Sequence, residues 1–330
     1  MSYYLKPFAA ALAVAALTAG TFSVAATTAE VRAPAVEAAA QPQQSGVYRY
    51  RLGDFEITAL SDGTVPLDVH ALLQGATAKS IDGRLYRAFL SNPVEESVNA
   101  FLIDTGEKLI LVDTGAGDLF GPGAGGKLIA NLKQAGYEPS QISDVLLTHV
   151  HTDHSGGLVH NGKIVFANAV VHVGKPDADF FLDAAHQHGV NGYAKEYFEQ
   201  ATLCLAPYVK TGQLQPFSGS TQILPGIRSI STPGHTPGHS SYRVESQGQS
   251  MTFIGDIVHV ESIQFEKPDI TIQFDVSQSE AAKQRIKQFS ILSKSRELVA
   301  GAHIPFPGLG HINADSHGAY RFVPANYRNR

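Results

Sequence analysis

The sequence predicts a single α/β domain, and three observations carry that prediction. Short runs of alternating apolar and polar residues, bounded by glycine, proline and asparagine, indicate β hairpins. These runs alternate along the chain with segments of helical periodicity, which is the pattern of a mixed sheet-and-helix fold. Polar residues recur just after the apparent strand ends, and no second block of strand–helix alternation indicates a separate cofactor domain.

The N-terminal residues have the composition of a processing signal. Lys6 gives the N-terminal region a positive charge, residues 8–19 are apolar, and the small residues at 25–33 are plausible cleavage sites. Because the apolar run is shorter than the ~20 residues that span a bilayer, we expect residues 1–33 to be a removed signal peptide. The protein would then be periplasmic or secreted and free of the membrane; a retained anchor is the alternative. Residues 34–45 are expected to be a linker and residues 46–330 the catalytic domain.

Strands and helices follow one another along the domain. The predicted strands alternate apolar and polar residues or are short apolar runs; they are 48–52, 55–60, 98–103, 108–112, 240–244 and 250–254. The predicted helices repeat apolar residues about every three to four positions; they are 127–135, 176–185, 193–205 and 277–300. We expect Ser61-Asp62-Gly63 to close the first hairpin, and Ser277 and Glu280 to form a capping box on the last helix.

The composition narrows the classes of partner and ligand. The chain has 330 residues, of which 43% are hydrophobic and 17% charged, and its formal net charge is -5. No basic stretch indicates nucleic acid or an anionic membrane as a partner. Because Cys204 is the one cysteine, the chain forms no internal disulfide, and metal ligands must be histidine and carboxylate. Cys204 itself is expected to be a small buried hydrophobe.

The strongest chemical signal directly follows the apolar run 145–147. Three imidazoles and a carboxylate stand there: His149, His151, Asp153 and His154. If the apolar run is a buried strand, His149 and His151 point the same way and share one cation, while Asp153 and His154 reach a second. Surface loops carry such residues by chance, but four of them in six positions, followed by two glycines, indicate a metal site.

A two-metal site built only from histidine and carboxylate needs about seven ligands, one of them a carboxylate shared by both ions. The chain offers further donors in glycine-containing loops or at apparent strand ends. The candidates, in chain order, are His235 or His239, then Asp256, then one of His259, His303 and His311. Spacing alone leaves these alternatives open.

These segments resemble the metallo-β-lactamase superfamily. Its signature metal loop is similar to residues 148–154, its second histidine segment to residues 232–239, and its bridging aspartate segment to Ile254-Gly255-Asp256. Asp113 resembles the aspartate that supports the ligands from behind without touching a metal. The resemblance implies a four-layer αβ/βα sandwich in a single domain, with the metals at one edge of the two sheets.

Within the superfamily, the sequence is similar to the methyl parathion hydrolases, a group of secreted organophosphate-degrading enzymes, over about residues 48–327. The similarity is clearest in residues 52–64, 119–122, 244–249 and 320–324. It implies one ion on His149, His151 and His235, the other on Asp153, His154 and His303, and a bridging Asp256. His239 then supports the ligands from behind, and His311 is structural. A homodimer is also implied.

The same resemblance implies an apolar, aromatic pocket beside the metals. Its wall would be formed by Leu67, Phe120, Phe181, Tyr197, His259 and Phe274. Phe181 stands where that group has a tryptophan, Leu72 where it has an arginine, and His259 and Phe274 where it has leucines. The pocket therefore departs from that of the organophosphate enzymes.

We therefore expect a binuclear zinc hydrolase that cleaves esters, lactones or phosphotriesters by attack of a hydroxide shared by two divalent cations. Asp153 and Asp256 would be its catalytic carboxylates. An apolar pocket favours neutral aryl esters and lactones as native substrates, with organophosphates hydrolysed promiscuously. The alternatives are a persulfide dioxygenase of the same fold with one iron, and a metal-binding protein without catalysis.

Overall fold

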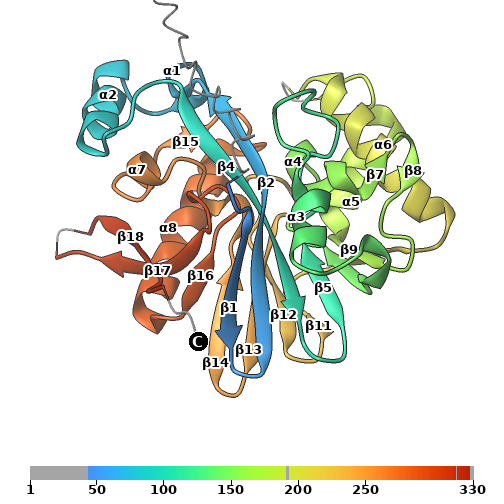
Figure 1. The fold of residues 1–330 in the computed structure, drawn as a ribbon. Helices are drawn as coiled ribbons and strands as arrows, with labels where there is room; N and C mark the ends of the chain where they lie inside the picture. The colour runs from blue at the N-terminus through green and yellow to red at the C-terminus, as the bar shows by residue number, and fades with distance from the viewer. Residues whose placement is uncertain (1–43, 191–192, 317, 328–330) are drawn as a thin grey trace, which may run out of the picture. The chain divides into compact units, whose positions relative to one another are not determined.

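Two seven-stranded sheets lie face to face at the centre of the fold (Figure 1). The first has the strand order β1-β2-β4-β5-β6-β9-β10 and the second the order β11-β12-β13-β14-β16-β17-β18. The computed structural model describes residues 44–330 except 191–192, 317 and 328–330. The predicted signal segment 1–33 and most of the predicted linker 34–45 lie outside the described residues.

The bounds of the elements are as follows. The first sheet consists of β1 (Val47–Leu52), β2 (Phe55–Leu67), β4 (Val94–Asp104), β5 (Leu109–Val112), β6 (Asp144–Leu146), β9 (Val170–Gly174) and β10 (Leu214–Phe217). The second consists of β11 (Gln222–Leu224), β12 (Ile227–Ser231), β13 (Ser240–Ser246), β14 (Gln249–Phe253), β16 (Leu298–Ala300), β17 (Leu309–Ala314) and β18 (Tyr320–Pro324). Two short ribbons pair β3 (Leu73–Gln74) with β15 (Thr271–Ile272) and β7 (Val159–His160) with β8 (Lys163–Ile164). The α-helices are α1 (Val69–Leu72), α2 (Ala78–Arg87), α3 (Leu128–Gln134), α4 (Thr152–Ser155), α5 (Lys175–Leu182), α6 (Lys195–Lys210), α7 (Glu261–Gln264) and α8 (Gln278–Ser295).

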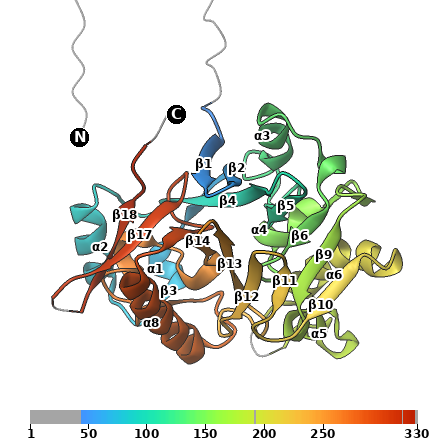
Figure 2. The same ribbon diagram turned by 90° about the horizontal axis from the view of Figure 1, so that it is seen from below.

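The layers arise because successive side chains of a strand point to opposite faces. Phe101 of β4 packs between the sheets against Phe253 of β14, with ring centroids 5.3 Å apart. Its neighbour Leu102 points the other way, into the cluster with α3, α5 and α6. On the far side of the second sheet, Val299 packs with Phe289 of α8. Figure 2 shows α3 and α8 on opposite sides of the two sheets. The predicted single-domain, four-layer αβ/βα architecture is confirmed.

The predicted turn at Ser61-Asp62-Gly63 is wrong, because β2 continues through it to Leu67. The strand bends instead of reversing, and its pairing with β4 shifts register between Ser61 and Gly63. The Asp62 carboxylate is buried and accepts hydrogen bonds from the backbone N–H groups of Ala116, Gly126 and Leu128. A polar residue that looks like a turn former thus anchors the glycine-rich loop that follows β5.

The predicted helix 277–300 ends earlier, at Ser295. Arg296 adopts a left-handed conformation with φ 58°, and Leu298–Ala300 forms β16, which pairs in parallel with β14. Pairing with a buried strand therefore overrides the helical periodicity of this segment. The predicted capping box is also wrong, because the Ser277 side chain makes no capping hydrogen bond. Among the described residues, no helix is both long and apolar enough to cross a membrane.

Truncating a core side chain of the first sheet should destabilise the fold far more than truncating a surface one. Leu111 of β5 is fully buried, so Leu111→Ala should lower the free energy of unfolding by about 2–5 kcal/mol. Leu203 of α6 is 46% exposed, and Leu203→Ala, the matched control, should change it by about 0.5 kcal/mol or less. Urea unfolding followed by circular dichroism measures both. Equal losses would contradict the position of the core.

Candidate metal centre

The polar residues that the sequence singled out meet at one edge of the sheets, because each follows a strand that ends there. Asp113 follows β5 and His149 follows β6, and these two strands are parallel neighbours. In the second sheet, Asp256 follows β14 and His303 follows its parallel neighbour β16. His235 follows β12. The carboxyl ends of parallel strands share an edge, which is where open α/β sheets bind ligands.

One group of side chains offers four ligand atoms that lie within 4.8 Å of one another: His149, His151, His235 and Asp256. All four residues are buried. His235 Nε2 lies 3.1 Å from Asp256 Oδ2 and 2.9 Å from His151 Nδ1. His149 Nε2 lies 3.5 Å from the same Asp256 oxygen. The three imidazoles therefore point to one place beside a carboxylate.

A second group joins Asp153, His154 and His303 within the same limit of 4.8 Å. Asp153 Oδ2 lies 3.5 Å from His154 Nε2 and 3.4 Å from His303 Nε2. The other carboxylate oxygen of Asp256, Oδ1, faces this group at 3.1 Å from His154 Nε2 and 3.2 Å from His303 Nε2. Asp256 thus lies between the two groups and presents one oxygen to each.

The structure separates the histidines that the sequence left as alternatives. His239 lies behind Asp256, where its Nε2 accepts a hydrogen bond from the Asp256 N–H at 3.0 Å. Burial lowers the pKa of His239 to about 3, so the ring is neutral and can accept that bond. His311 lies away from both groups, with Nδ1 3.1 Å from the Arg296 carbonyl oxygen.

His259, which spacing left open as a ligand and the resemblance placed in the pocket wall, lies beside Asp256. Its Nε2 lies 3.1 Å from Asp256 Oδ2, and its ring stacks on His303 with centroids 5.1 Å apart. Asp256, His259 and His303 form a third candidate group of ligands. His259 therefore belongs both to the cluster and to the cavity wall.

Three buried atoms at the centre of the cluster have no hydrogen-bond partner within the described part of the chain: His149 Nε2, His154 Nε2 and Asp256 Oδ1. Buried polar atoms of folded proteins are usually paired, so converging unpaired ones indicate a bound ion. Imidazole nitrogen and carboxylate oxygen are ligands that zinc accepts in its catalytic sites. The residues present therefore fit a divalent cation in each group.

Buried carboxylates orient these imidazoles from behind. Asp113 accepts hydrogen bonds from the Thr148 backbone N–H at 2.7 Å and hydroxyl at 2.8 Å, and its Oδ2 lies 2.9 Å from His154 Nδ1. Asp275 Oδ1 lies 2.8 Å from His235 Nδ1. A carboxylate on one ring nitrogen fixes the tautomer and directs the other nitrogen to the metal position.

Asp177 of α5 ties the two histidine segments together. It accepts hydrogen bonds from the Val150 N–H, the Thr236 hydroxyl and the Gly238 N–H. Burial raises the pKa of Asp177 to about 6. These hydrogen bonds fix the position of the loop after β6 relative to the loop after β12.

His151 is held from its other side by Tyr193. The Tyr193 oxygen lies 3.1 Å from His151 Nε2, and its hydroxyl donates to the carbonyl oxygen of Phe274. Sequence reasoning missed four residues of this environment: Glu96, Asp177, Tyr193 and Asp275. No local pattern marks them, because their partners are distant in sequence; His235 and Asp275 are 40 positions apart.

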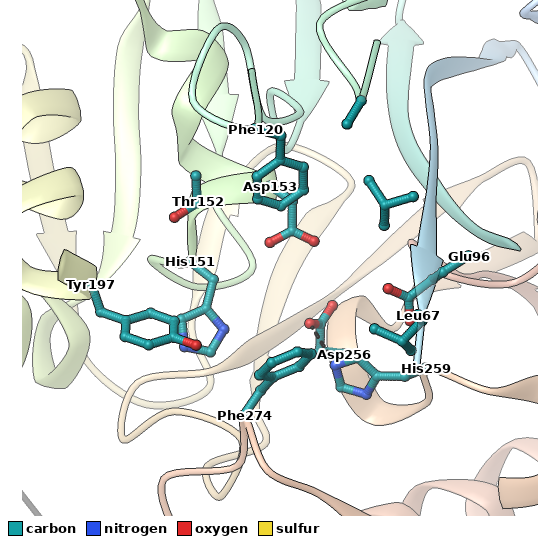
Figure 3. A pocket seen from close by; sticks show the side chains of 12 residues that line it. Leu67, Glu96, Phe120, His151, Thr152, Asp153, Tyr197, Asp256, His259 and Phe274 are labelled. Carbon is teal, nitrogen blue, oxygen red and sulfur yellow. Dashed lines mark ion pairs between the residues drawn. The ribbon is translucent and has the colours of Figure 1, made fainter. Parts of the chain in front are cut away.

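An apolar cavity of about 330 Å³ opens beside the cluster (Figure 3). Its wall includes five of the six predicted pocket residues, Leu67, Phe120, Tyr197, His259 and Phe274, together with Val65, Glu96, Ala124, His151, Thr152, Asp153 and Asp256. The prediction for Phe181 is wrong, because this residue is fully buried and does not line the cavity. Phe181 lies on the inner face of α5, where its ring meets the His151 ring edge to face.

Charges around the cluster shift several pKa values in opposite directions. Burial lowers the pKa of His149 and His151 well below the usual range. Burial also opposes protonation of His235 and His303, but the surrounding carboxylates, Asp256 first, outweigh it and raise their pKa values to about 9 and about 10. Burial raises the pKa of Glu96, on the cavity wall, to about 7.

Residues 93–303 match the sequence model of the metallo-β-lactamase superfamily. The chain is 26% identical over 221 residues to an N-acyl homoserine lactonase of Bacillus cereus, which covers 62% of the chain and 79% of the relative. It is 27% identical over 196 residues to an atrochrysone carboxyl ACP thioesterase of Aspergillus fumigatus, which covers 56% of the chain and 51% of the relative.

Two solved structures are also similar. One is that of the hydrolase AbOPH of the β-lactamase superfamily, with a TM-score of 0.82, 34% identity, and coverage of 87% of this chain and 100% of that one. The other is AidC, a dizinc quorum-quenching lactonase in complex with the product N-hexanoyl-L-homoserine, with a TM-score of 0.78, 26% identity, and coverage of 86% and 99%.

Zinc binding at pH 7 should release protons from the cluster. The pKa values of His235 and His303 are about 9 and about 10, and nearby carboxylates, Asp256 first, hold the pKa of His154 well above its usual value. All three are therefore protonated at pH 7 without metal and must lose that proton to coordinate an ion. Calorimetric titration in two buffers of different ionisation enthalpy should give roughly three protons released per chain. The release should decrease as the pH approaches those pKa values. Zinc binding without proton release would contradict the assignment.

Proposed function

The chain belongs to the metallo-β-lactamase superfamily and is a metal-dependent hydrolase, and we propose that it is a binuclear zinc enzyme that hydrolyses lactones and aryl esters. The observation that carries the proposal is the pair of ligand groups that meet at Asp256 beside an apolar cavity. Similarity to lactonases, one of them a dizinc enzyme, supports both the metal and the substrate class.

The two ligand groups define the proposed ion positions. We assign one ion to His149, His151 and His235, the other to Asp153, His154 and His303, and the bridging position to Asp256. When bound, two zinc ions supply a nucleophile at neutral pH and polarise the bond under attack. Asp113, Asp275 and His239 keep the ligands oriented through their hydrogen bonds.

The chain's own residues hold the substrate and exclude water. Leu67, Phe120, Tyr197 and Phe274 form an apolar wall that suits a neutral acyl or aryl group. Asp153 lines the same cavity, and its side chain is 18% exposed. We propose that this carboxylate, which is ionised at the start, accepts a proton from the attacking water and passes it to the oxygen of the leaving alcohol as the ester bond breaks.

The two competing functions leave either the second ligand group or the open cavity unexplained. A persulfide dioxygenase with one iron needs a single ligand group, whereas Asp153, His154 and His303 supply a second group. A metal-binding protein without catalysis would close its ligands around the ion. Here Asp153 and Asp256 border an open cavity, which favours catalysis.

Three further points are part of the proposal. Hydrolysis of phosphotriesters is proposed as a side activity, because a neutral apolar phosphotriester suits the same wall. Export through residues 1–33 and assembly into a homodimer are proposed from the sequence alone.

Purified protein loaded with zinc should hydrolyse lactones and aryl esters faster than phosphotriesters. We would assay dihydrocoumarin, phenyl acetate, N-hexanoyl-homoserine lactone and methyl parathion, and measure by mass spectrometry the metal content of the protein as purified, before zinc is added. Two zinc ions per chain together with lactone or aryl ester turnover is the expected result. One iron per chain, or no hydrolysis of any of the four compounds, would refute the proposal.

Asp256→Ala should remove nearly all activity, because the two ion positions lose their shared ligand. Metal stabilisation of several kcal/mol corresponds to a loss of about 10³-fold in kcat/KM. The matched control is Asp179→Ala, which removes an exposed carboxylate that pairs with Lys175. Dihydrocoumarin hydrolysis and zinc content measure both variants. Full activity of Asp256→Ala would rule out the bridging role.

A further inference from the structure

The cavity wall contains a carboxyl group that the proposed chemistry does not use. Glu96 lies on β4, where it pairs in register with Val65 of β2, and both residues line the cavity. Glu96 is only 6% exposed, yet its Oε1 has no hydrogen-bond partner among the described residues. Figure 3 shows its carboxyl group directed toward the cavity, on the side opposite Tyr197.

Glu96 does not orient a histidine as Asp113 and Asp275 do. Those two carboxylates lie 2.9 Å and 2.8 Å from the Nδ1 atoms of their imidazoles. Glu96 Oε2 lies 3.9 Å from His303 Nδ1, which instead donates to the carbonyl oxygen of Ser97 at 2.8 Å. The Glu96 carboxyl is therefore close to the cluster without holding any of its rings in place.

A buried polar atom without a partner costs free energy, and that cost is recovered when a bound molecule supplies the missing hydrogen bond. A carboxyl oxygen accepts a hydrogen bond in either protonation state. Val65, Leu67 and Phe274 of the cavity wall are apolar, and the polar residues of the wall, among them Thr152, Tyr197 and His259, make no hydrogen bond to Glu96 Oε1. A donor for Glu96 Oε1 must therefore come from the molecule in the cavity.

We propose that Glu96 is a substrate-recognition residue whose Oε1 accepts a hydrogen bond from an N–H or O–H group of the substrate. The preferred substrates are then lactones and esters that carry such a donor near the bond that is cleaved, rather than purely apolar ones. This inference rests on the proposed hydrolase function and defines its substrate class. Sites that hydrogen-bond a substrate donor discriminate strongly against analogues that lack it.

Two matched substrate pairs test the inference. The first is N-hexanoyl-homoserine lactone and its analogue with an ester oxygen in place of the amide N–H. The second is a ring-hydroxylated dihydrocoumarin and dihydrocoumarin itself. The unmodified protein should favour the donor-bearing member of at least one pair by about 10- to 100-fold in kcat/KM. Equal rates within both pairs would overturn the inference, and this measurement needs no substitution.

Substitutions then locate the effect. Glu96→Met keeps the length of the side chain but removes the acceptor, so it should abolish the preference for the donor by lowering kcat/KM more for the donor-bearing member of each pair than for the donor-free member. Glu96→Gln retains an acceptor oxygen and should restore much of the preference. The control is Glu95→Met, since Glu95 is the exposed neighbour on β4 and should behave like the unmodified protein.

The outcomes separate this inference from the proposed function. If the unmodified protein hydrolyses no member of either substrate pair, the proposed function itself fails. If it hydrolyses them and Glu96→Met retains the preference for the donor, only the role of Glu96 is refuted. Equal losses on both members of each pair would indicate a structural role, which also overturns the inference.

Discussion

The site depends on the burial of one carboxylate, Asp256, between two sets of imidazoles. Its two oxygens lie 3.1 Å from His235 Nε2 and 3.1 Å from His154 Nε2, so each faces a different group. A buried charge is stable only when it is paired. In the metal-free chain the protonated His235 and His303, whose pKa values are raised to about 9 and about 10, provide that pairing. Bound cations would pair with the Asp256 carboxylate in their place.

Such a cluster needs rigid support, and buried carboxylates outside it supply that support. Asp113 fixes the segment after β6, Asp275 fixes His235, and Asp177 joins the loops that follow β6 and β12. The strand ends bring these segments to one edge, and the carboxylates then determine which ring nitrogen is presented. Their hydrogen bonds make the site a property of the whole domain, because the partners come from both sheets and from α5.

Reaction type and substrate choice are located in different parts of the site. The imidazoles and carboxylates of the cluster determine what bond chemistry is possible, and they lie at strand ends in the core of the domain. The apolar part of the cavity wall, with Leu67 and Phe274, lies beside the cluster and supplies none of its candidate ligands. Changes in the wall can therefore alter specificity while the hydrolytic chemistry persists.

The sequence by itself determined the α/β class, the donor types and the loop from His149 to His154, because these depend on local spacing and on having one cysteine. Residue spacing left the distant ligands open and the family resemblance implied His235, Asp256 and His303, but only the tertiary structure shows these residues side by side. It brought His303 to the cluster and left His311 outside, placed Phe181 in the core, and turned residues 298–300 into a strand. Glu96, Tyr193 and Asp275 also became visible only in three dimensions. Their roles come from packing and hydrogen bonds between segments far apart in the chain, and no local pattern encodes such contacts.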